Sequence, residues 1–328
     1  MGIYALPMHK LPVGVLGASG YAGRELLALV DRHPRLALAF AAAHARRGER
    51  ATIGGRRITF DATENAPLAD AALVFSALPH GESAPWVARA EAAGAKVVDL
   101  SADLRPGGGA PAAEVPYGLT EIARERVRGA QVVANPGCYA TAALLALAPL
   151  ARRGLIAAGE TITINAASGV TGAGFTPRAD LLFAEVAEDF RAYALGNTHR
   201  HVAEMHAVLG GLGADADLIF TPHLLPVSRG ILATITLAVI SLPTDVLAPW
   251  RAQYADEPFI ELTEDAPALR DVVRRNAMRL TARALAGTRR PTLQIVVAID
   301  NLVKGAAGPA MQNANLLLGL DETLGLPA

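Results

Sequence analysis

One segment near the N-terminus sets the architecture of this 328-residue chain: Val13-Gly14-Val15-Leu16-Gly17-Ala18-Ser19-Gly20-Tyr21-Ala22-Gly23-Arg24-Glu25. It has the pattern of a β-strand that enters a glycine-rich turn and continues as a helix. In such a turn, glycines let the backbone approach a pyrophosphate, and the helix start presents free N–H groups to it. Ser19 stands where the common fingerprint has its second glycine, so the motif is a variant. The sequence therefore predicts a dinucleotide site at Gly17, Ser19, Gly20, Tyr21, Ala22 and Gly23.

Strand and helix patterns alternate after this segment. Short apolar runs lie between helical patterns, and this alternation indicates βαβ units, a parallel sheet and right-handed crossovers. The expected strands are 11–16, 36–42, 71–78, 96–100 and 131–134, and the first expected helix is 20–32.

The pattern changes past Cys138. Longer, β-branched runs follow with fewer helices between them, which favours a mixed or antiparallel sheet. The expected strands here are 161–167, 217–225, 230–241 and 293–301, with helices at 139–153 and 306–318, the last of them capped by Gly319. We therefore predict an α/β protein: a Rossmann-type, doubly wound parallel sheet, joined near Cys138 to a second α+β domain with a mixed or antiparallel sheet.

Composition narrows the classes of function. Aromatic residues make up only 5% of a chain that is 52% hydrophobic, so alanine, leucine and valine must fill the cores. The 30 basic and 31 acidic residues give a net charge of −1, and no basic run indicates a nucleic-acid partner. No apolar stretch reaches the roughly 20 residues of a membrane span. One cysteine and no export signal lead us to expect a cytoplasmic protein.

The end of the second expected strand indicates which dinucleotide binds. An NAD site usually has an acidic residue there to hold the ribose 2′-hydroxyl. The segment 41–47 reads Ala-Ala-Ala-His-Ala-Arg-Arg and contains no acid. Arg46 and Arg47 are suited to a 2′-phosphate, which favours NADP. The alternative is that they are two solvated loop arginines.

The only cysteine lies in a second informative segment, Asn135-Pro136-Gly137-Cys138-Tyr139-Ala140-Thr141. A strand ends, Pro-Gly breaks it, and an alanine-rich helix starts at the cysteine. The positive end of a helix dipole lowers the pKa of a thiol and raises its thiolate fraction. We therefore expect Cys138 to be a nucleophile. The alternative is a small core residue, because cysteine is among the most buried residue types.

A thiolate needs a proton partner, and two imidazoles lie in one segment, Asn197-Thr198-His199-Arg200-His201-Val202-Ala203-Glu204. On a helix that begins near His201, Glu204 lies three residues on and can orient the ring. A His-x-His spacing also suggests zinc, but no second cysteine exists and His206 falls off the helical face, so we expect no metal site. A solvated polar loop is the remaining alternative.

Several segments, taken in order, resemble the N-acetyl-γ-glutamyl-phosphate reductase family, within the aspartate-semialdehyde dehydrogenase superfamily. The resemblance covers nearly the whole chain. Each segment alone is modest, and the set in this order is highly specific. The segments are 17–23, 77–81 (Ala-Leu-Pro-His-Gly), 99–105 (Asp-Leu-Ser-Ala-Asp-Leu-Arg), 135–141, 199–201, 221–231 and 298–305.

This resemblance implies a reaction. NADPH would reduce an acyl phosphate, N-acetyl-γ-glutamyl phosphate, to the semialdehyde in arginine biosynthesis, through a thioester on Cys138. It implies that His201, or else His199, is the acid and base. Residues expected at the cofactor are Pro79, His80, Gly81 and Asn301, and those expected at the substrate are Ser168, Arg105 and Arg229. The two arginines suit anionic substrate ends, with a structural ion pair as the alternative for each.

The resemblance also implies a domain arrangement. An NADP-binding domain would comprise residues 1–138 and 304–328, and residues 139–303 would form a catalytic and oligomerisation domain of a homodimer or homotetramer. Two departures from the family pattern stand out: Phe175 replaces an expected basic residue, with Arg178 three positions on, and Ala203 replaces a proline.

Two other functions compete with this interpretation. One is a related reductase acting on aspartyl phosphate or on a carrier-bound aminoadipate. The other is a non-catalytic, NADP-sensing regulator that kept the nucleotide fold. Cys138, the histidine pair and Arg229 argue against the regulator.

Overall fold

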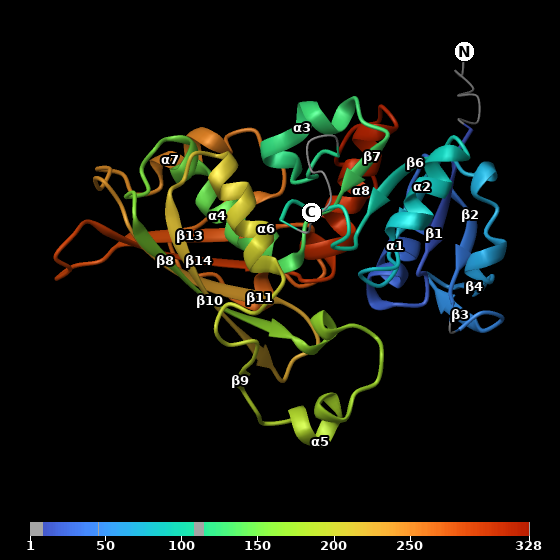
Figure 1. The fold of residues 1–328 in the computed structure, drawn as a ribbon, viewed down its shortest axis with the longest axis horizontal. Coiled ribbons are helices and arrows are strands. Elements are labelled where there is room, and N and C mark those ends of the chain that lie inside the picture. The colour runs from blue at the N-terminus through green and yellow to red at the C-terminus, as the bar shows by residue number, and fades with distance from the viewer. Residues whose placement is uncertain (1–8, 45, 108–114, 328) are drawn as a thin grey trace, which may run out of the picture.

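Two sheets, packed side by side, form the body of the molecule in the computed structural model, which describes residues 9–44, 46–107 and 115–327 (Figure 1). The first sheet is parallel and has the strand order β2-β1-β5-β6-β7. Its strands are β1 (Leu11–Leu16), β2 (Leu36–Ala42), β5 (Leu73–Ser76), β6 (Lys96–Asp99) and β7 (Val132–Ala134). The predicted parallel sheet is confirmed.

Helices α1 (Tyr21–Arg32), α2 (Ala84–Ala92) and α3 (Thr120–Arg128) connect these strands. Strand β1 is apolar on both faces because it lies inside the sheet, between β2 and β5, and α1 buries a stripe of leucines against it. The carboxyl ends of β1, β5, β6 and β7 therefore lie along one edge, where ligands of such sheets bind.

The C-terminal helix returns to this first sheet. Helix α8 (Gly308–Leu317) belongs to the same hydrophobic core as Val13 and Leu26, and Asn313 on it donates to the carbonyl of Gly118 at 2.8 Å. The single helix expected at 306–318 is instead a π-helical turn, Val303–Ala307, followed by α8. The turn carries Gly305 to the backbone of Cys138, where a Cβ would lie 2.7 Å from the cysteine Cβ.

The second sheet has seven strands in the order β12-β13-β14-β11-β8-β10-β9. Parallel pairs β8–β10 and β12–β13 occur beside antiparallel neighbours, so the predicted mixed sheet is confirmed. The strands are β8 (Glu160–Gly169), β9 (Arg191–Ala192), β10 (Ala216–Leu225), β11 (Ile231–Ala238), β12 (Ile260–Leu262), β13 (Met278–Ala284) and β14 (Thr292–Ile299).

One face of this sheet is covered by α4 (Cys138–Arg152), α6 (His201–Gly211) and α7 (Ala248–Gln253) (Figure 1). Helix α4 is buried along almost its whole length, because alanine and leucine on every side let it pack between the sheet and α6. It runs from the boundary of the two sheets into the second core.

Sequence patterns missed several elements. The strand β13 reads Met-Arg-Leu-Thr-Ala-Arg-Ala, and its alternation is obscured by Arg279 and Arg283 on the less buried face. The hairpin β3 (Arg50–Ile53) and β4 (Arg56–Thr59) is too polar to stand out, and α5 (Phe183–Val186) is a single turn. Within the described ranges, no helix is long and apolar enough to cross a bilayer.

Candidate active site

Cys138 is the first residue of α4 and follows strand β7 by three residues. Gly137 precedes it with extended backbone (ψ 152°), and no side chain caps the helix start. The cysteine is partly exposed, and Gly305 lies against its backbone. The placement at a helix start is therefore as the sequence predicted, and the side chain packs against the second hydrophobic core.

Glu204 holds the residue in front of the cysteine. Its Oε1 accepts hydrogen bonds from the backbone N–H of Gly137 at 2.8 Å and from the Tyr117 hydroxyl at 2.7 Å. Its Oε2 lies 3.4 Å from Nη1 of Arg105 and 3.9 Å from Nε2 of His201. This buried carboxylate thus joins α6 to the start of α4, and it touches the imidazole less closely than it touches the backbone.

His201 lies directly beside the start of α4. A Cβ on Gly137 would overlap Nε2 of His201, so glycine is required there for the ring to come this close. The Nδ1 atom is buried without a hydrogen-bond partner among the described residues. Burial, followed by the positive charge of Arg105, holds the pKa of His201 well below its usual value. The ring is therefore neutral at physiological pH.

His199 has different surroundings. Its ring contacts those of Tyr139, Tyr193, Phe220 and His201 edge to face, with centroid distances of 4.7–5.9 Å. Its Nδ1 accepts from the backbone N–H of His201 at 3.2 Å. Burial and the charge of Arg200 lower its pKa to about 4. These contacts make His199 a support for the position of His201.

The expected lowering of the thiol pKa is not what the structure gives. Burial raises the pKa of Cys138, and the positive charges of Arg200 and Arg105 offset this only in part. The loss of hydration that favours the charged form of the thiol outweighs these two charges and the hydrogen bond from the Tyr139 N–H. Cys138 thus lies next to Gly137, the residue against which Nε2 of His201 packs.

Arg200 is the residue that sequence reasoning left without a role. It precedes α6, its positive charge lowers the pKa of both Cys138 and His80, and its side chain makes no hydrogen bond or ion pair with the described residues. Its position between two histidines in the sequence was the available signal. The Arg200 guanidinium is thus a cation whose charge acts on the Cys138 sulfur and whose N–H donors are not used by the described residues.

The two arginines expected at the substrate are both engaged in internal contacts. Arg105 is buried, donates from Nε to the carbonyl of Asn135 at 2.8 Å and from Nη2 to that of Leu100 at 2.6 Å, and pairs with Glu204. Arg229 pairs with Glu25 of α1 and lies 3.5 Å from Asp300. Each arginine thus has the ion pair that was the alternative, and the expected contacts of both with the substrate stay a prediction.

The glycine-rich turn has the shape of a phosphate cradle. Gly17 has φ of +71°, and a Cβ there would overlap the carbonyl of Ala77. A Cβ on Gly23 would overlap the carbonyl of Gly17, so α1 packs tightly on the turn. Gly20 precedes α1, and neither a capping side chain nor an acidic residue occupies its first turn. The helix start is therefore available to an anion, and the residues present fit a dinucleotide.

Arg46 and Arg47 follow β2, whose carboxyl end lies next to that of β1 because the two strands are parallel neighbours. Arg46 pairs with Glu49 at 2.5 Å, and Arg47 donates from Nη1 to the carbonyl of His44 at 3.3 Å. Neither contact is buried, and both arginines remain accessible. No acidic residue replaces them at the end of β2.

The loop 79–81 follows β5, next to the glycine-rich turn. Nδ1 of His80 accepts from the backbone N–H of Ala102 at 2.8 Å, and Asp103 accepts from that of Gly81 at 2.6 Å. Burial, with Arg200 and Arg105, lowers the pKa of His80 to about 4. These bonds fix the loop at the shared edge of the sheet beside Pro79.

Ser168 and Asn301 lie at the ends of β8 and β14. The Ser168 hydroxyl is buried and donates to the carbonyl of Gly169 at 3.1 Å. Asn301 accepts from the backbone N–H of Gly230 at 2.8 Å and donates to the Thr171 hydroxyl at 2.9 Å. Asn301 thus fastens two loops together, and its expected contact with a cofactor stays a prediction.

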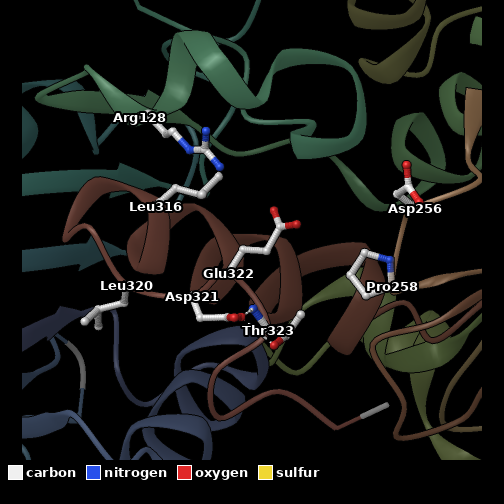
Figure 2. Close-up of a pocket in the computed structure, with 8 residues that line it drawn as sticks. All are labelled: Arg128, Asp256, Pro258, Leu316, Leu320, Asp321, Glu322 and Thr323. Atoms are coloured by element: carbon white, nitrogen blue, oxygen red, sulfur yellow. Dashed lines mark hydrogen bonds between the residues drawn. The ribbon is translucent and has the colours of Figure 1, made fainter.

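A shallow depression elsewhere has none of this chemistry (Figure 2). It lies between the end of α8 and the segment before β12, away from the glycine-rich turn and the cysteine in the fold. Its lining residues are Arg128, Asp256, Pro258, Leu316, Leu320, Asp321, Glu322 and Thr323. In the part of the chain that the structure describes, no three His, Cys, Asp or Glu residues are placed to hold a metal ion.

Comparison with protein families matches both halves of the chain. Residues 12–130 match the "Semialdehyde dehydrogenase, NAD binding domain", and residues 138–301 match the "Semialdehyde dehydrogenase, dimerisation domain". Solved aspartate semialdehyde dehydrogenases have the same fold. The Vibrio cholerae enzyme II gives a TM-score of 0.77 at 20% identity over 95% of this chain and 99% of that one. The Candida albicans enzyme gives 0.66 at 17% identity over 94% and 98%. The fold and the cysteine at the domain boundary define a two-domain semialdehyde dehydrogenase.

Closer relatives narrow this class. The N-acetyl-γ-glutamyl-phosphate reductase of Salinispora arenicola is 44% identical over 96% of this chain and 97% of its own length. Those of Symbiobacterium thermophilum and Bordetella bronchiseptica are 39% and 38% identical, with at least 96% of each chain covered. The chain therefore belongs to the N-acetyl-γ-glutamyl-phosphate reductases of the semialdehyde dehydrogenase family.

Proposed function

We propose that this protein reduces N-acetyl-γ-glutamyl phosphate to N-acetylglutamate semialdehyde with NADPH, in arginine biosynthesis. The observation that carries the proposal is the position of Cys138 at the start of α4, beside a neutral histidine and at the edge of the nucleotide sheet. Family membership over nearly the whole chain supports the same reaction.

Thioester formation follows from this arrangement. Nε2 of His201 takes the thiol proton, and the Cys138 sulfur attacks the acyl carbon. The carbon–oxygen bond to phosphate then breaks, inorganic phosphate leaves, and a thioester remains. A thioester accepts hydride more readily than a carboxylate does, which is the reason for splitting the reaction into two steps. After reduction, the sulfur leaves as thiolate and recovers its proton from His201.

The start of α4 also supplies donors for the developing oxyanion. The first backbone N–H groups of a helix have no partner within the helix, and in α4 they belong to Cys138 and the residues that follow it. One such donor is worth about 3–4 kcal/mol of transition-state stabilisation in other enzymes. Glu204 fixes the approach to the helix by holding the Gly137 N–H, so its proposed role is to position the nucleophile.

NADP is the proposed cofactor, and when bound it supplies the hydride that reduces the thioester. Its pyrophosphate fits the turn Gly17–Gly23, and the loop at Pro79, His80 and Gly81 borders it along the same sheet edge. Arg46 and Arg47 are proposed to bind the 2′-phosphate, because both are accessible and no acid stands at the end of β2.

Arg200 is the proposed partner for a substrate anion. Both ends of an N-acetyl-γ-glutamyl phosphate carry negative charge, and Arg binds carboxylate or phosphate through two parallel hydrogen bonds. Its guanidinium acts on Cys138 and is not used by the described residues, whereas Arg105 and Arg229 are already paired. Ser168, at the buried end of β8, is proposed to contact the substrate from the second domain.

We propose the same division of the chain as the resemblance implied. Residues 1–138 and 304–328 form the NADP-binding domain, supported by the packing of α8 in the first core, and residues 139–303 form the second domain. A lone cysteine used as a nucleophile must stay reduced, which supports a cytoplasmic location.

A homo-oligomer, dimer or tetramer, is also proposed. The seven-stranded sheet has helices on one face only, and the segment with α5 and β9 projects beyond the other (Figure 1). Large apolar side chains are exposed on this segment and on the neighbouring β10: Leu182, Phe183, Phe190, Leu195 and Ile219. A second copy of the chain would cover them, in keeping with the match to a dimerisation domain. Phe183→Asp is expected to reduce the mass measured by light scattering to that of a smaller assembly.

A direct spectrophotometric assay tests the proposed reaction. The purified protein is given NADP, phosphate and N-acetylglutamate semialdehyde, and NADPH formation is followed by absorbance. We expect a phosphate-dependent rate, and a rate at least about 100-fold lower with aspartate semialdehyde, because that compound lacks the N-acetyl group and one methylene of the proposed substrate and makes fewer contacts. A higher rate with aspartate semialdehyde would assign the chain to the competing reductase. No rate with either, together with slow alkylation of Cys138 by iodoacetamide that NADPH does not change, would support a regulator.

A further inference from the structure

One contact between the two domains involves a residue that differs from the family pattern, Phe175. Its ring lies against the glycine-rich turn of the other domain: it meets the Tyr21 ring edge to face at 5.0 Å. Two guanidinium groups lie over the same ring, with the Cζ atoms of Arg24 and Arg46 at 4.7 and 5.1 Å from its centroid. A basic residue expected at this position is thus replaced by a ring that gathers two basic residues from the first domain.

The segment that carries Phe175 is anchored at its root. The Val170 N–H donates to the carbonyl of Val227 at 2.9 Å, and the Thr171 hydroxyl donates to that of Ser228 at 2.6 Å. Gly174, with φ of +89°, then turns the chain so that Phe175 leaves the second domain. Phe175 is itself 36% exposed and the residues that follow are exposed too, so its ring is the part of this segment that contacts the first domain.

The geometry leaves donors free for a ligand. Arg24 uses Nε for the carbonyl of Ser19 at 2.9 Å, and its two Nη groups make no hydrogen bond with the described residues. A guanidinium stacked on a ring keeps its N–H groups in its own plane, where a phosphate can bind them. Arg178, the nearest basic residue after Phe175, pairs with Asp180 instead and does not take part.

We infer that Phe175 determines cofactor specificity by holding Arg24 and Arg46 as a pair that binds the 2′-phosphate. The inference rests on the proposed use of NADP and adds two residues to it: Arg24 as a phosphate ligand, and Phe175 as the residue that positions both arginines. The second domain thereby contributes to nucleotide recognition by the first.

The test compares Phe175→Leu, which removes the ring and keeps apolar bulk, with Phe175→Tyr, which keeps the ring. Dissociation constants for NADPH and NADH are measured by fluorescence titration of the full chain. For Phe175→Leu we expect NADPH to bind about fivefold more weakly and NADH to change less than twofold, with kcat at saturating NADPH retained. Phe175→Tyr should match the unaltered chain, and Arg24→Ala should lose NADPH affinity selectively.

Any other result would contradict either the inference about Phe175 or the proposed cofactor. Equal weakening of NADPH and NADH by Phe175→Leu would mean that the ring only holds the domains together, and an unchanged NADPH affinity would mean that it has no role; either overturns the inference. An unaltered chain that binds NADH as tightly as NADPH would overturn the proposed cofactor itself. The two failures are therefore distinguishable, because the second appears before any substitution is made.

Discussion

The starts of α1 and α4 are two versions of one local structure. Both helices follow a strand of the same parallel sheet, both begin after a glycine, Gly20 or Gly137, and neither has a side-chain cap. Their surroundings differ. At Gly20 a Cβ would meet the backbone carbonyl of Gly17 at 3.6 Å, which leaves room for an anion.

At α4 the space is filled by side chains from other parts of the chain. Glu204 takes the Gly137 N–H, and His201 and Arg105 press against the same glycine. The two helix starts therefore differ in what surrounds them: backbone at Gly20, and a histidine, an arginine and a carboxylate at Gly137. The difference lies in what the tertiary fold brings to each glycine.

The largest effect is expected from a substitution that acts at the start of α4 and not at the start of α1. Replacing Cys138 with Ser removes the nucleophile at α4 and leaves α1 untouched, because an alcohol is far harder to ionise than a thiol. We expect kcat in the phosphate-dependent assay to fall at least about 10³-fold, with the NADPH dissociation constant unchanged. A near-normal rate would exclude thioester chemistry.

The next prediction concerns the carboxylate that only α4 has. Glu204→Ala leaves Arg105 as a buried, unbalanced charge and deprives the Gly137 N–H and Tyr117 hydroxyl of their acceptor. We expect the free energy of unfolding in urea to drop by about 3 kcal/mol or more, and by less for Glu204→Gln, which keeps an acceptor. Asp180→Ala, which removes an exposed pair with Arg178, is the matched control and should change little. Equal effects for Glu204→Ala and this control would show that the carboxylate does not hold α4.

Acid should lower the free energy of unfolding through the histidines beside α4. The folded-state pKa of His199 is about 4 and that of an unfolded histidine is about 6.5, so the unfolded chain binds more protons between these values. Stability is therefore lost as the pH falls from 6.5 toward 4, by about 2 kcal/mol at pH 5 for this ring, with a further loss from buried His201. Urea unfolding at pH 7.5 and 5 measures it. His199→Phe should reduce the difference, and His206→Asn, at an exposed position of α6, should retain it.

The smallest expected effect lies beside α1. Arg46→Ala should raise the NADPH dissociation constant about tenfold and leave that of NADH within about twofold, because only the 2′-phosphate loses a partner. The same titration on Arg57→Ala, in the neighbouring hairpin strand β4, controls for a general loss of positive charge. If both substitutions act alike, the effect is long-range electrostatics and Arg46 has no specific contact.

Much of the fold was predictable because it depends on local patterns. The strands 11–16 and 36–42 were predicted with the bounds that β1 and β2 have, and the start of α4 was displaced by one residue. The strand β13 was missed because Arg279 and Arg283 on one face hide its alternation, and β12 because it has only three residues. The π-helical turn at Val303–Ala307 was missed because its cause, Gly305 packing on Cys138, is a contact across the chain.

The sequence by itself determined two helix starts after glycines, a single thiol at one of them, and arginines in place of an acid beyond the second strand, because turns, caps and strand ends follow from neighbouring residues. Only the tertiary structure decided that burial raises the pKa of the thiol and that Phe175 contacts the other domain. It also decided that Arg105 and Arg229 are engaged in ion pairs, whereas Arg200 makes none with the described residues. The physical reason is that desolvation and charge pairing depend on distances between residues that are far apart in the chain.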